Sequence, residues 1–237
     1  MCFSATASFT AGTGLLVMGA ITTRLASRRK ELAFAAIPLL FAVQQIIEGA
    51  LWLTFPREVP LLKATLTYSY SIFSHVLWPI YVPIAVLLLE PVEWRRRVLT
   101  GIASAGFAAG IYLLYFIITL PIVARVQGQH IVYDSPHFYA VIVMILYVSG
   151  TCVSSVFSSF KLVRLFGLVS FLSFGATAVF YRTWFISVWC FFAAVLSSII
   201  LLHFLERSSS RSGQSRSATT APLKPALQNG SSKHAPR

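Results

Sequence analysis

The chain has 237 residues, of which 57% are hydrophobic and only 11% are charged. Soluble globular domains are about 45–50% apolar and about 25% charged, so the composition argues against a soluble enzyme, a secreted module or a nucleic-acid-binding domain. The mean hydropathy of +0.75 agrees with this reading. Lys and Arg nevertheless outnumber Asp and Glu by 19 to 7, and their positions decide what that surplus means. The sequence predicts an integral membrane protein.

Apolar stretches long enough to cross a bilayer as helices, about 20 residues each, follow one another through most of the chain. They span 3–23, 32–55, 63–89, 98–123, 138–160, 162–181 and 183–205. Lys161 and Arg182 separate the last three stretches, and a fusion of two of these would be too long for a bilayer. We therefore predict an all-α fold, a polytopic bundle of seven transmembrane helices over residues 1–206.

Basic residues are distributed unevenly over the loops of this bundle. One side of the membrane receives Arg57, Lys63, Arg125 and Arg182, while the rest of the 19 basic residues fall on the other side or in the tail. Cytoplasmic loops carry the excess of Lys and Arg in membrane proteins. We expect the N-terminus outside, the C-terminus in the cytoplasm, and a location in the cell membrane (inner or plasma membrane). The net charge of +12 thus marks a membrane side and not a nucleic-acid partner.

Two further compositional features concern packing and order. Residues 207–237 are rich in Ser, Gly, Pro, Gln and basic residues, which predicts a disordered basic cytoplasmic tail. The first and fourth stretches are rich in small residues, with Gly106 and Gly110 in GxxxG spacing. Small residues let helix backbones approach closely in a membrane, so we expect these two helices to be tightly packed, with packing against each other as one arrangement.

Glu48 is the only acidic residue within a predicted span. An ionisable group there costs several kcal/mol unless it is paired, neutralised or hydrated, and it therefore indicates a functional site. Gln44 and Gln45 lie one turn earlier, on the same helix face. An alternative is a protonated glutamic acid that only holds helices together.

The third stretch supplies a counterpart to Glu48 at a similar depth. Ser71 and His75 lie one turn apart in an unusually polar segment, and Pro79 cannot donate to the carbonyl of His75. This combination predicts a place where water or a cation binds; an ordinary kink beside a buried histidine is the alternative. Glu48 and His75 are the candidate catalytic residues, and Gln44, Gln45, Glu48, Ser71, His75 and Arg182 are the candidate ligand-binding residues.

The predicted outer loop between the fourth and fifth stretches concentrates His130, Asp134 and His137. Together with His75 they are the metal-ligand candidates, although Pro136 argues against a regular helix that would bring the loop residues together. A hydrated polar loop is the alternative. The sequence names no cofactor and assigns no role to Cys2. Its expected partners are the lipid bilayer and a small-molecule, ion or lipid ligand, without nucleic acid.

Several segments resemble a bacterial family of uncharacterised multi-pass membrane proteins, catalogued as a domain of unknown function. They are Met1-Cys2-Phe3-Ser4-Ala5-Thr6-Ala7-Ser8-Phe9, the run from Ile37 to Gly49, the Trp78-Pro79 and Leu89-Glu90-Pro91 pairs, and the run from Ser187 to Ala194. The resemblance covers about residues 1–205. It implies a seven-helix membrane protein, and it brings no activity with it.

Two classes of function are compatible with these residues. The first is an outward-facing polar ligand or ion site built around Glu48 and His75. The second is a membrane-embedded, hydrolase-like enzyme that uses a metal or a His/Glu acid-base pair; the spacing of Ser71 and His75 resembles that in seven-helix hydrolases similar to alkaline ceramidases, which carry an additional paired H-x3-H in their last helix. A carrier or an accessory subunit without chemistry remains as a further alternative. We place the ligand site first, because no nucleophile motif accompanies these residues.

Overall fold

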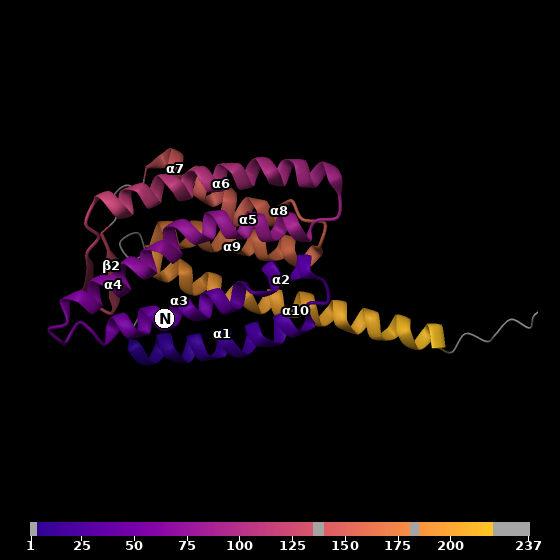
Figure 1. The fold of residues 1–237 in the computed structure, drawn as a ribbon, viewed down its shortest axis with the longest axis horizontal. Coiled ribbons are helices and arrows are strands. Elements are labelled where there is room, and N and C mark those ends of the chain that lie inside the picture. The colour runs from indigo at the N-terminus through magenta and orange to yellow at the C-terminus, as the bar shows by residue number, and fades with distance from the viewer. Residues whose placement is uncertain (1–3, 135–139, 181–184, 220–237) are drawn as a thin grey trace, which may run out of the picture.

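The structure, a computed structural model, describes residues 4–134, 140–180 and 185–219. It is mostly helical, and its long helices lie roughly along one common axis (Figure 1). In chain order the helices are α1 (Ala5–Leu25), α2 (Arg29–Ala35), α3 (Ile37–Trp52), α4 (Pro60–Ser71), η1 (Ile72–Leu77), α5 (Trp78–Leu89), α6 (Glu93–Thr119), α7 (Val141–Val148), η3 (Ser149–Val153), α8 (Ser154–Val156), α9 (Lys161–Phe180) and α10 (Phe185–Thr219). The segments η1 and η3 are π-helical turns within longer helices.

Several of these helices are long and apolar enough to cross a membrane. They are Ala5–Leu25, Arg29–Trp52, Pro60–Leu89, Glu93–Thr119 and Lys161–Phe180. A shorter apolar helix, Val141–Val156, lies within the predicted stretch 138–160. Large apolar side chains on the helix surfaces are exposed, for example Ile118 at 75% and Phe180 at 76%, which is typical of surfaces that contact other molecules or lipid. The prediction of several apolar helices long enough to cross a membrane is confirmed, whereas the count of seven and the orientation stay predictions.

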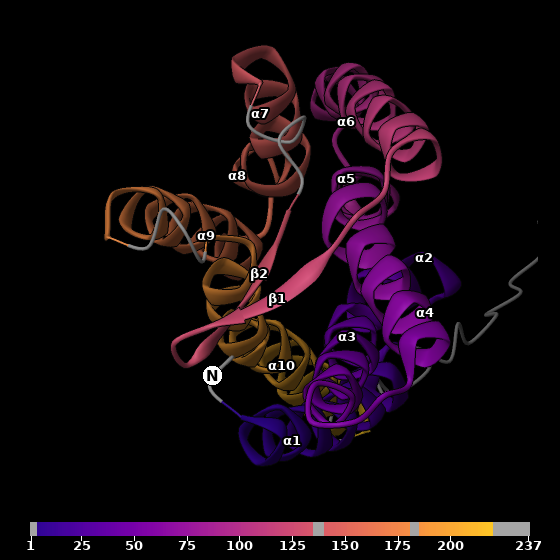
Figure 2. The same cartoon turned by 90° about the vertical axis from the view of Figure 1, so that its left-hand side faces the viewer.

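The two helices rich in small residues pack closely, each on a different neighbour. Gly19 of α1 faces α3, where an added Cβ would lie 2.5 Å from the side chain of Leu39. Gly106 and Gly110 of α6 face α5 instead. Helices α1 and α6 lie on opposite sides of the bundle in both ribbon views (Figures 1 and 2). The arrangement in which these two helices pack against each other is therefore wrong.

A freed carbonyl explains why glycine is needed on α6 and η3. Pro83 lies inside α5 and has no N–H, so it cannot donate to the carbonyl of Pro79 one turn earlier. Gly106 of α6 and Gly150 of η3 lie against that oxygen, and a Cβ on Gly150 would be 2.7 Å from it. Cα–H groups of closely approaching helices make weak hydrogen bonds to such carbonyls. Both glycines therefore hold their helices against α5 immediately beside η1.

A β-hairpin that the sequence analysis did not predict lies in the loop after α6. It consists of β1 (Ala124–Gln127) and β2 (His130–Tyr133), and Gln127 pairs with His130. Gly128 has a φ of 64° whereas Gln129 has no positive φ, which is the geometry of a two-residue type II′ turn. In Figure 2 the hairpin crosses the end of the bundle. There the Tyr133 ring stacks on Tyr70 of α4, with 4.4 Å between ring centroids.

Helix α10 continues to Thr219 and projects beyond the other helices (Figure 1). The helix thus extends into the segment from residue 207 for which composition predicts disorder. Contacts of Arg207 explain its first turn there, because Nη2 lies 3.0 Å from Oε1 of Glu31 and the guanidinium lies 4.9 Å from the Phe160 ring centroid. The rest of the predicted tail, 220–237, lies outside the described residues.

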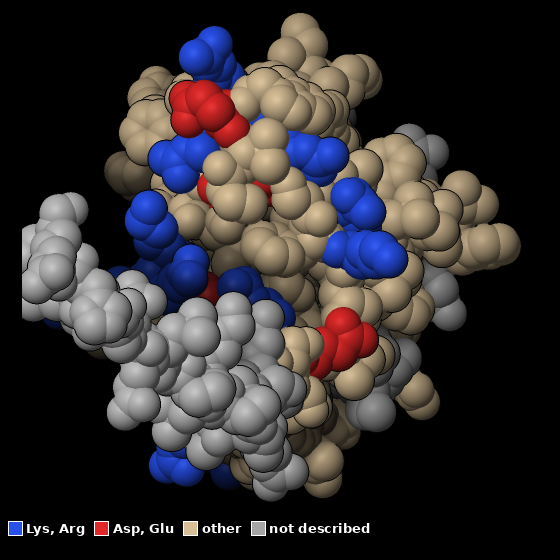
Figure 3. Space-filling model, turned by 90° about the vertical axis from the view of Figure 1, so that its right-hand side faces the viewer, with Lys and Arg blue, Asp and Glu red and all other residues tan. Residues whose placement is uncertain are grey.

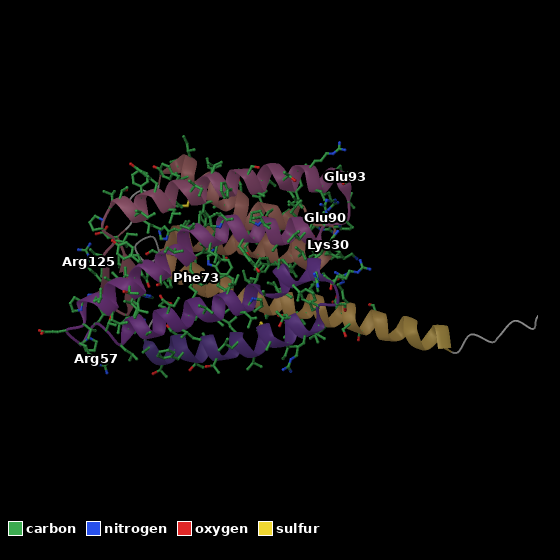
Figure 4. The ribbon with its side chains drawn as sticks, viewed as in Figure 1. Lys30, Arg57, Phe73, Glu90, Glu93 and Arg125 are labelled. Atoms are coloured by element: carbon green, nitrogen blue, oxygen red, sulfur yellow. The ribbon has the colours of Figure 1, made fainter. Side chains whose placement is uncertain are left out.

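Charged side chains mark the two ends of the bundle. Figure 4 shows Lys30, Glu90 and Glu93 at one end, and Arg57 and Arg125 at the other, where the hairpin lies. We call the first the basic end, made of the segments 26–31, 90–97 and 157–164, and the second the hairpin end. Phe73 of η1 lies between the two ends (Figure 4), so η1 is placed within the body of the bundle.

Candidate functional site: a buried polar cluster on α3 and η1

The polar residues of α3 are completely enclosed. Gln44, Gln45 and Glu48 each have 0% of their surface exposed. Gln45 Nε2 donates to Glu48 Oε2 at 3.5 Å, as expected for residues on one helix face. A carboxyl group removed from water in this way costs several kcal/mol unless neighbouring groups compensate it. Burial of this strip therefore requires compensating contacts for the Glu48 carboxyl group.

The last residue of α4 and the π-helical turn η1 present a second set of buried polar groups. Ser71, Ser74 and His75 are all buried. The Nδ1 atom of His75 lies 2.8 Å from Ser74 Oγ and 3.1 Å from the carbonyl oxygen of Ser71. A carbonyl can only accept, so the second bond places the imidazole proton on Nδ1 and leaves the lone pair on Nε2. The π-helical turn directly precedes Trp78 and Pro79, where the sequence predicted a disrupted helix, and such turns are frequent at functional sites.

A hydrogen bond between α3 and α5 brings the two sets of groups to the same depth. Trp78 Nε1 donates to Gln44 Oε1 at 2.7 Å. The two helices run in opposite directions (Figure 1). Glu48 lies about 6 Å from Gln44 toward the hairpin end, at 1.5 Å per residue, and Ser74 precedes Trp78 by the same number of residues. Glu48 therefore lies level with Ser74 and His75 of the neighbouring helix.

Helix α1 contributes a residue that the sequence analysis did not assign to the site. Ser8 is completely buried. Its neighbours on α1 contact α3 around Glu48: a Cβ on Gly12 would lie 3.5 Å from Cβ of Gln45, and a Cβ on Gly49 would lie 3.1 Å from the Phe9 ring. Ser8 thus lies at the depth of Glu48. A single serine among many small residues carries no signal in sequence, which is why it was missed.

Aromatic residues close the cluster on its other sides. The hydroxyl group of Tyr147, from α7, donates to the carbonyl oxygen of Ser74, a backbone group within the π-helical turn. Trp189 of α10 packs on Tyr147, with 5.6 Å between ring centroids. Toward the hairpin end, the stacked pair of Tyr70 and Tyr133 adjoins Ser71 in the chain. The cluster is therefore enclosed in this structure, and the outward-facing character of the site stays a prediction.

Four buried polar atoms of this cluster form no hydrogen bond with any residue that the structure describes. They are Ser8 Oγ, Gln44 Nε2, Gln45 Oε1 and Ser71 Oγ. Each such group costs about 1–3 kcal/mol when its hydrogen bond is lost, and the net stability of a protein is only about 5–15 kcal/mol. Orphaned atoms of this kind call for water, an ion or a ligand as partner. Their gathering on α1, α3 and α4–η1 distinguishes the cluster from an ordinary helix contact.

A small cavity lies on the basic-end side of Trp78. Its volume is about 30 Å³, and its lining includes Trp78, Tyr147, Cys152, Ser170 and Trp189. A water molecule needs about 10–15 Å³ measured in this way, so the cavity has room for one or two waters. Trp78 and Tyr147 both line the cavity and both form hydrogen bonds with the cluster. These two side chains therefore separate the cavity from the polar cluster.

Two further predicted site residues, His130 and Asp134, lie in and directly after strand β2 of the hairpin. His130 is buried in β2, and Asp134 forms an exposed ion pair with Arg125 at 2.6 Å. Burial lowers the pKa of His130 from its ordinary value of 6.5. No three His, Cys, Asp or Glu side chains within 4–134, 140–180 and 185–219 are arranged to hold a metal ion. Arg182 and His137 lie outside the described residues.

The comparisons with known proteins establish a family and no activity. A family model described as a family of unknown function (DUF6629) matches residues 1–217. The chain belongs to this family. No curated protein and no solved structure matches the chain significantly. The DUF6629 match includes every residue of the polar cluster and reaches into α10 beyond Leu205, further than the resemblance seen in the sequence.

Proposed function

We propose that this chain is an integral membrane protein that binds an ion or small polar ligand in the cluster of Gln44, Gln45, Glu48, Ser71 and His75, extended by Ser8. The observation that carries the proposal is the set of four orphaned buried atoms on α1, α3 and the end of α4, together with the buried carboxyl group of Glu48 on α3. The bundle has seven transmembrane helices, its hairpin end faces outward and its basic end faces the cytoplasm. This orientation rests on the uneven distribution of Lys and Arg.

Complete enclosure favours a small occupant. Glu48, Gln44 and Gln45 are 0% exposed, so a bulky substrate has no route to them without movement of a helix. The oxygen atoms of Glu48, Gln45 and Ser8 are of the type that hard cations prefer. His75 and Glu48 are groups that exchange protons in membrane proteins. The occupant is therefore a hydrated proton or a small hard cation.

An ion carrier is a second candidate, and buried polar residues between the cluster and the basic end favour it. Thr151, Ser154 and Ser155 follow one another along η3 and α8, and all are buried. Among the described residues, Ser155 Oγ and Ser170 Oγ have no hydrogen-bond partner. These side chains therefore place polar groups between the cluster and the basic end, at a depth where the helix that carries His75 is apolar. The hydrolase alternative has less support, because the cavity beside Trp78 is too small for more than one or two water molecules and leaves no room for a substrate.

Cation-dependent thermal unfolding of the purified full chain in detergent tests the proposal. The unfolding temperature is measured in lithium, sodium or potassium chloride and in choline chloride, at constant ionic strength and at several pH values. A cation that binds the folded state raises the unfolding temperature by mass action, and Glu48→Gln is expected to abolish that rise or the response to pH. Glu58→Gln, which changes an exposed carboxylate at the hairpin end, is the matched control. Identical cation and pH responses in wild type and Glu48→Gln would contradict the proposal.

A further inference from the structure

A second and larger cavity lies at the basic end, far from the polar cluster. Its volume is about 210 Å³, and it lies between α2, the end of α5, the start of α6, and α10. The charged residues that line it are Arg28, Lys30, Glu31, Glu90, Arg96 and Arg207. Figure 3 looks onto this end and shows Lys and Arg side chains gathered around a hollow, with carboxylate surface between them. Charged side chains thus make up much of the lining of this cavity at the end of the bundle.

Both carboxylates of this cavity already interact with protein donors. Glu31 Oε2 accepts from the backbone N–H of Ser27 at 2.9 Å, and Oε1 pairs with Arg207 at 3.0 Å. Glu90 accepts from the backbone N–H of Ser159 at 2.7 Å and from that of Val92 at 3.1 Å. Glu31 and Glu90 are each only 2% exposed. The four basic residues of the cavity, Arg28, Lys30, Arg96 and Arg207, outnumber these two carboxylates, so the cavity keeps a net positive charge.

Three basic side chains of the cavity remain available to bind a ligand. Arg28, Lys30 and Arg96 form no ion pair with a carboxylate in the part of the chain that the structure describes. The Arg96 guanidinium donates to the carbonyl oxygen of Glu90 at 3.5 Å, a long hydrogen bond. Arginine and lysine in a partly enclosed site favour phosphate, because guanidinium donors match its oxygen atoms. The cavity therefore favours an anion with several oxygen atoms.

The lining of the cavity also includes apolar residues. Leu88, Leu89, Pro91 and Phe160 line it. A volume of about 210 Å³ is many times the roughly 10–15 Å³ that one water molecule needs on the same measure, so a phosphate group with part of its organic substituent fits. An amphipathic lining at the end of membrane helices matches a phospholipid headgroup better than it matches free phosphate. Basic pockets between helices on the cytoplasmic side bind such headgroups.

We propose that this basic-end cavity binds the phosphate group of an anionic membrane lipid through Arg28, Lys30 and Arg96. Arg207 completes the site from α10, where its pairing with Glu31 fixes the position of its side chain. Lipid binding at this cavity therefore also ties α10 to α2 and α6. This lipid site is independent of the site proposed around Glu48, since the cavity lies at the basic end and the polar cluster lies within the body of the bundle.

Native mass spectrometry of the full chain in detergent, titrated with phosphatidylglycerol, phosphatidylcholine or inorganic phosphate, tests this site. Each surface cation contributes about 1 kcal/mol to anionic-lipid binding, so the double variant Arg28→Gln/Lys30→Gln is expected to bind phosphatidylglycerol about tenfold or more weakly. The double variant Arg24→Gln/Arg29→Gln removes two exposed cations at the same end that do not line the cavity. This matched control is expected to retain binding.

The outcomes separate the sources of the phosphate. Tight binding of phosphatidylglycerol without competition by inorganic phosphate supports the lipid site. Displacement of the lipid by millimolar phosphate supports the same phosphate chemistry with a soluble ligand. The charge-preserving variant Arg28→Lys/Lys30→Arg keeps binding if the site recognises charge. Equal losses in the two double variants, or equal binding of phosphatidylcholine and phosphatidylglycerol, would overturn the proposal.

Discussion

Trp78 donates its indole N–H to the side-chain oxygen of Gln44 across 2.7 Å, and this bond links α3 to α5 at one depth. The same Trp78 stacks on Phe41 at 3.9 Å between ring centroids. One side chain thus holds the carboxyl-bearing helix in register with the π-helical turn that carries His75. The position of Glu48 relative to His75 depends on this contact.

Trp78→Phe tests that dependence. Phenylalanine retains an aromatic ring for Phe41 but leaves Gln44 Oε1 buried without a donor. Loss of one partner of a buried hydrogen bond costs about 1–3 kcal/mol, so the unfolding temperature in detergent is expected to fall. Trp94→Phe, at a position 55% exposed on α6, is the control and is expected to unfold like wild type. Equal stability of both variants would refute the role of the Trp78–Gln44 bond.

Gly106→Ala is expected to destabilise the bundle. The added Cβ would collide with the carbonyl oxygen of Pro79, a backbone atom that cannot rotate away. Overpacking of this kind typically costs about 1–3 kcal/mol. Gly101→Ala on the same helix places its Cβ where no atom lies within 4 Å, so it is expected to be neutral or slightly stabilising. Thermal unfolding of the two variants side by side checks the prediction, which fails if they lose stability equally.

Arg207→Ala is expected to weaken the attachment of α10 at the basic end. Its ion pair with Glu31 has side-chain exposures of 26% and 3%, whereas the Arg97–Glu93 pair is exposed at 79% and 73%. Removal of Arg207 leaves Glu31 buried with less compensation, and the cost is expected at about 1–3 kcal/mol, below that of a fully buried pair. Arg97→Ala is expected to cost at most about 1 kcal/mol. Protease cleavage within α10 and thermal unfolding measure the difference.

Acidification is expected to destabilise the hairpin end through His130. Burial lowers the pKa of His130 below its ordinary value of 6.5, so the unfolded chain takes up the proton before the folded protein does. The stability contributed by the neutral imidazole is complete above pH 6.5 and is lost as pH falls below that value. Between pH 7.5 and about pH 5, the unfolding temperature should therefore fall more steeply in wild type than in His130→Gln. Parallel profiles would argue against this role.

The sequence patterns predicted α3 and η1 better than the surroundings of the site. Helical spacing placed Gln44, Gln45 and Glu48 on one face, and Pro79 indicated a disturbed helix beside His75, because both signals are local in the chain. Ser8 and Tyr147 join the cluster only through contacts between distant helices, and no local pattern encodes such contacts. Each is an ordinary residue of an apolar helix until its neighbours are known.

The hairpin was missed for a different reason. Its strands, Ala124–Gln127 and His130–Tyr133, are short, and the Gly128–Gln129 turn lies in a loop that was interpreted through its histidines. The turn signal of a glycine at the first central position was present. Helix α10 continues past residue 207, where the contact between Arg207 and Glu31 supports it, and the disorder of the tail stays a prediction.

Infrared difference spectroscopy of the full chain tests the central claim most directly, because it observes the carboxyl group of Glu48 itself. Spectra are recorded while the cation that stabilises the wild type is exchanged for choline, or while the pH is changed. Ligand or proton binding at the cluster predicts a change in a carboxyl band that disappears in Glu48→Gln and persists in Glu58→Gln. A wild-type difference spectrum that Glu48→Gln reproduces in full would contradict the account.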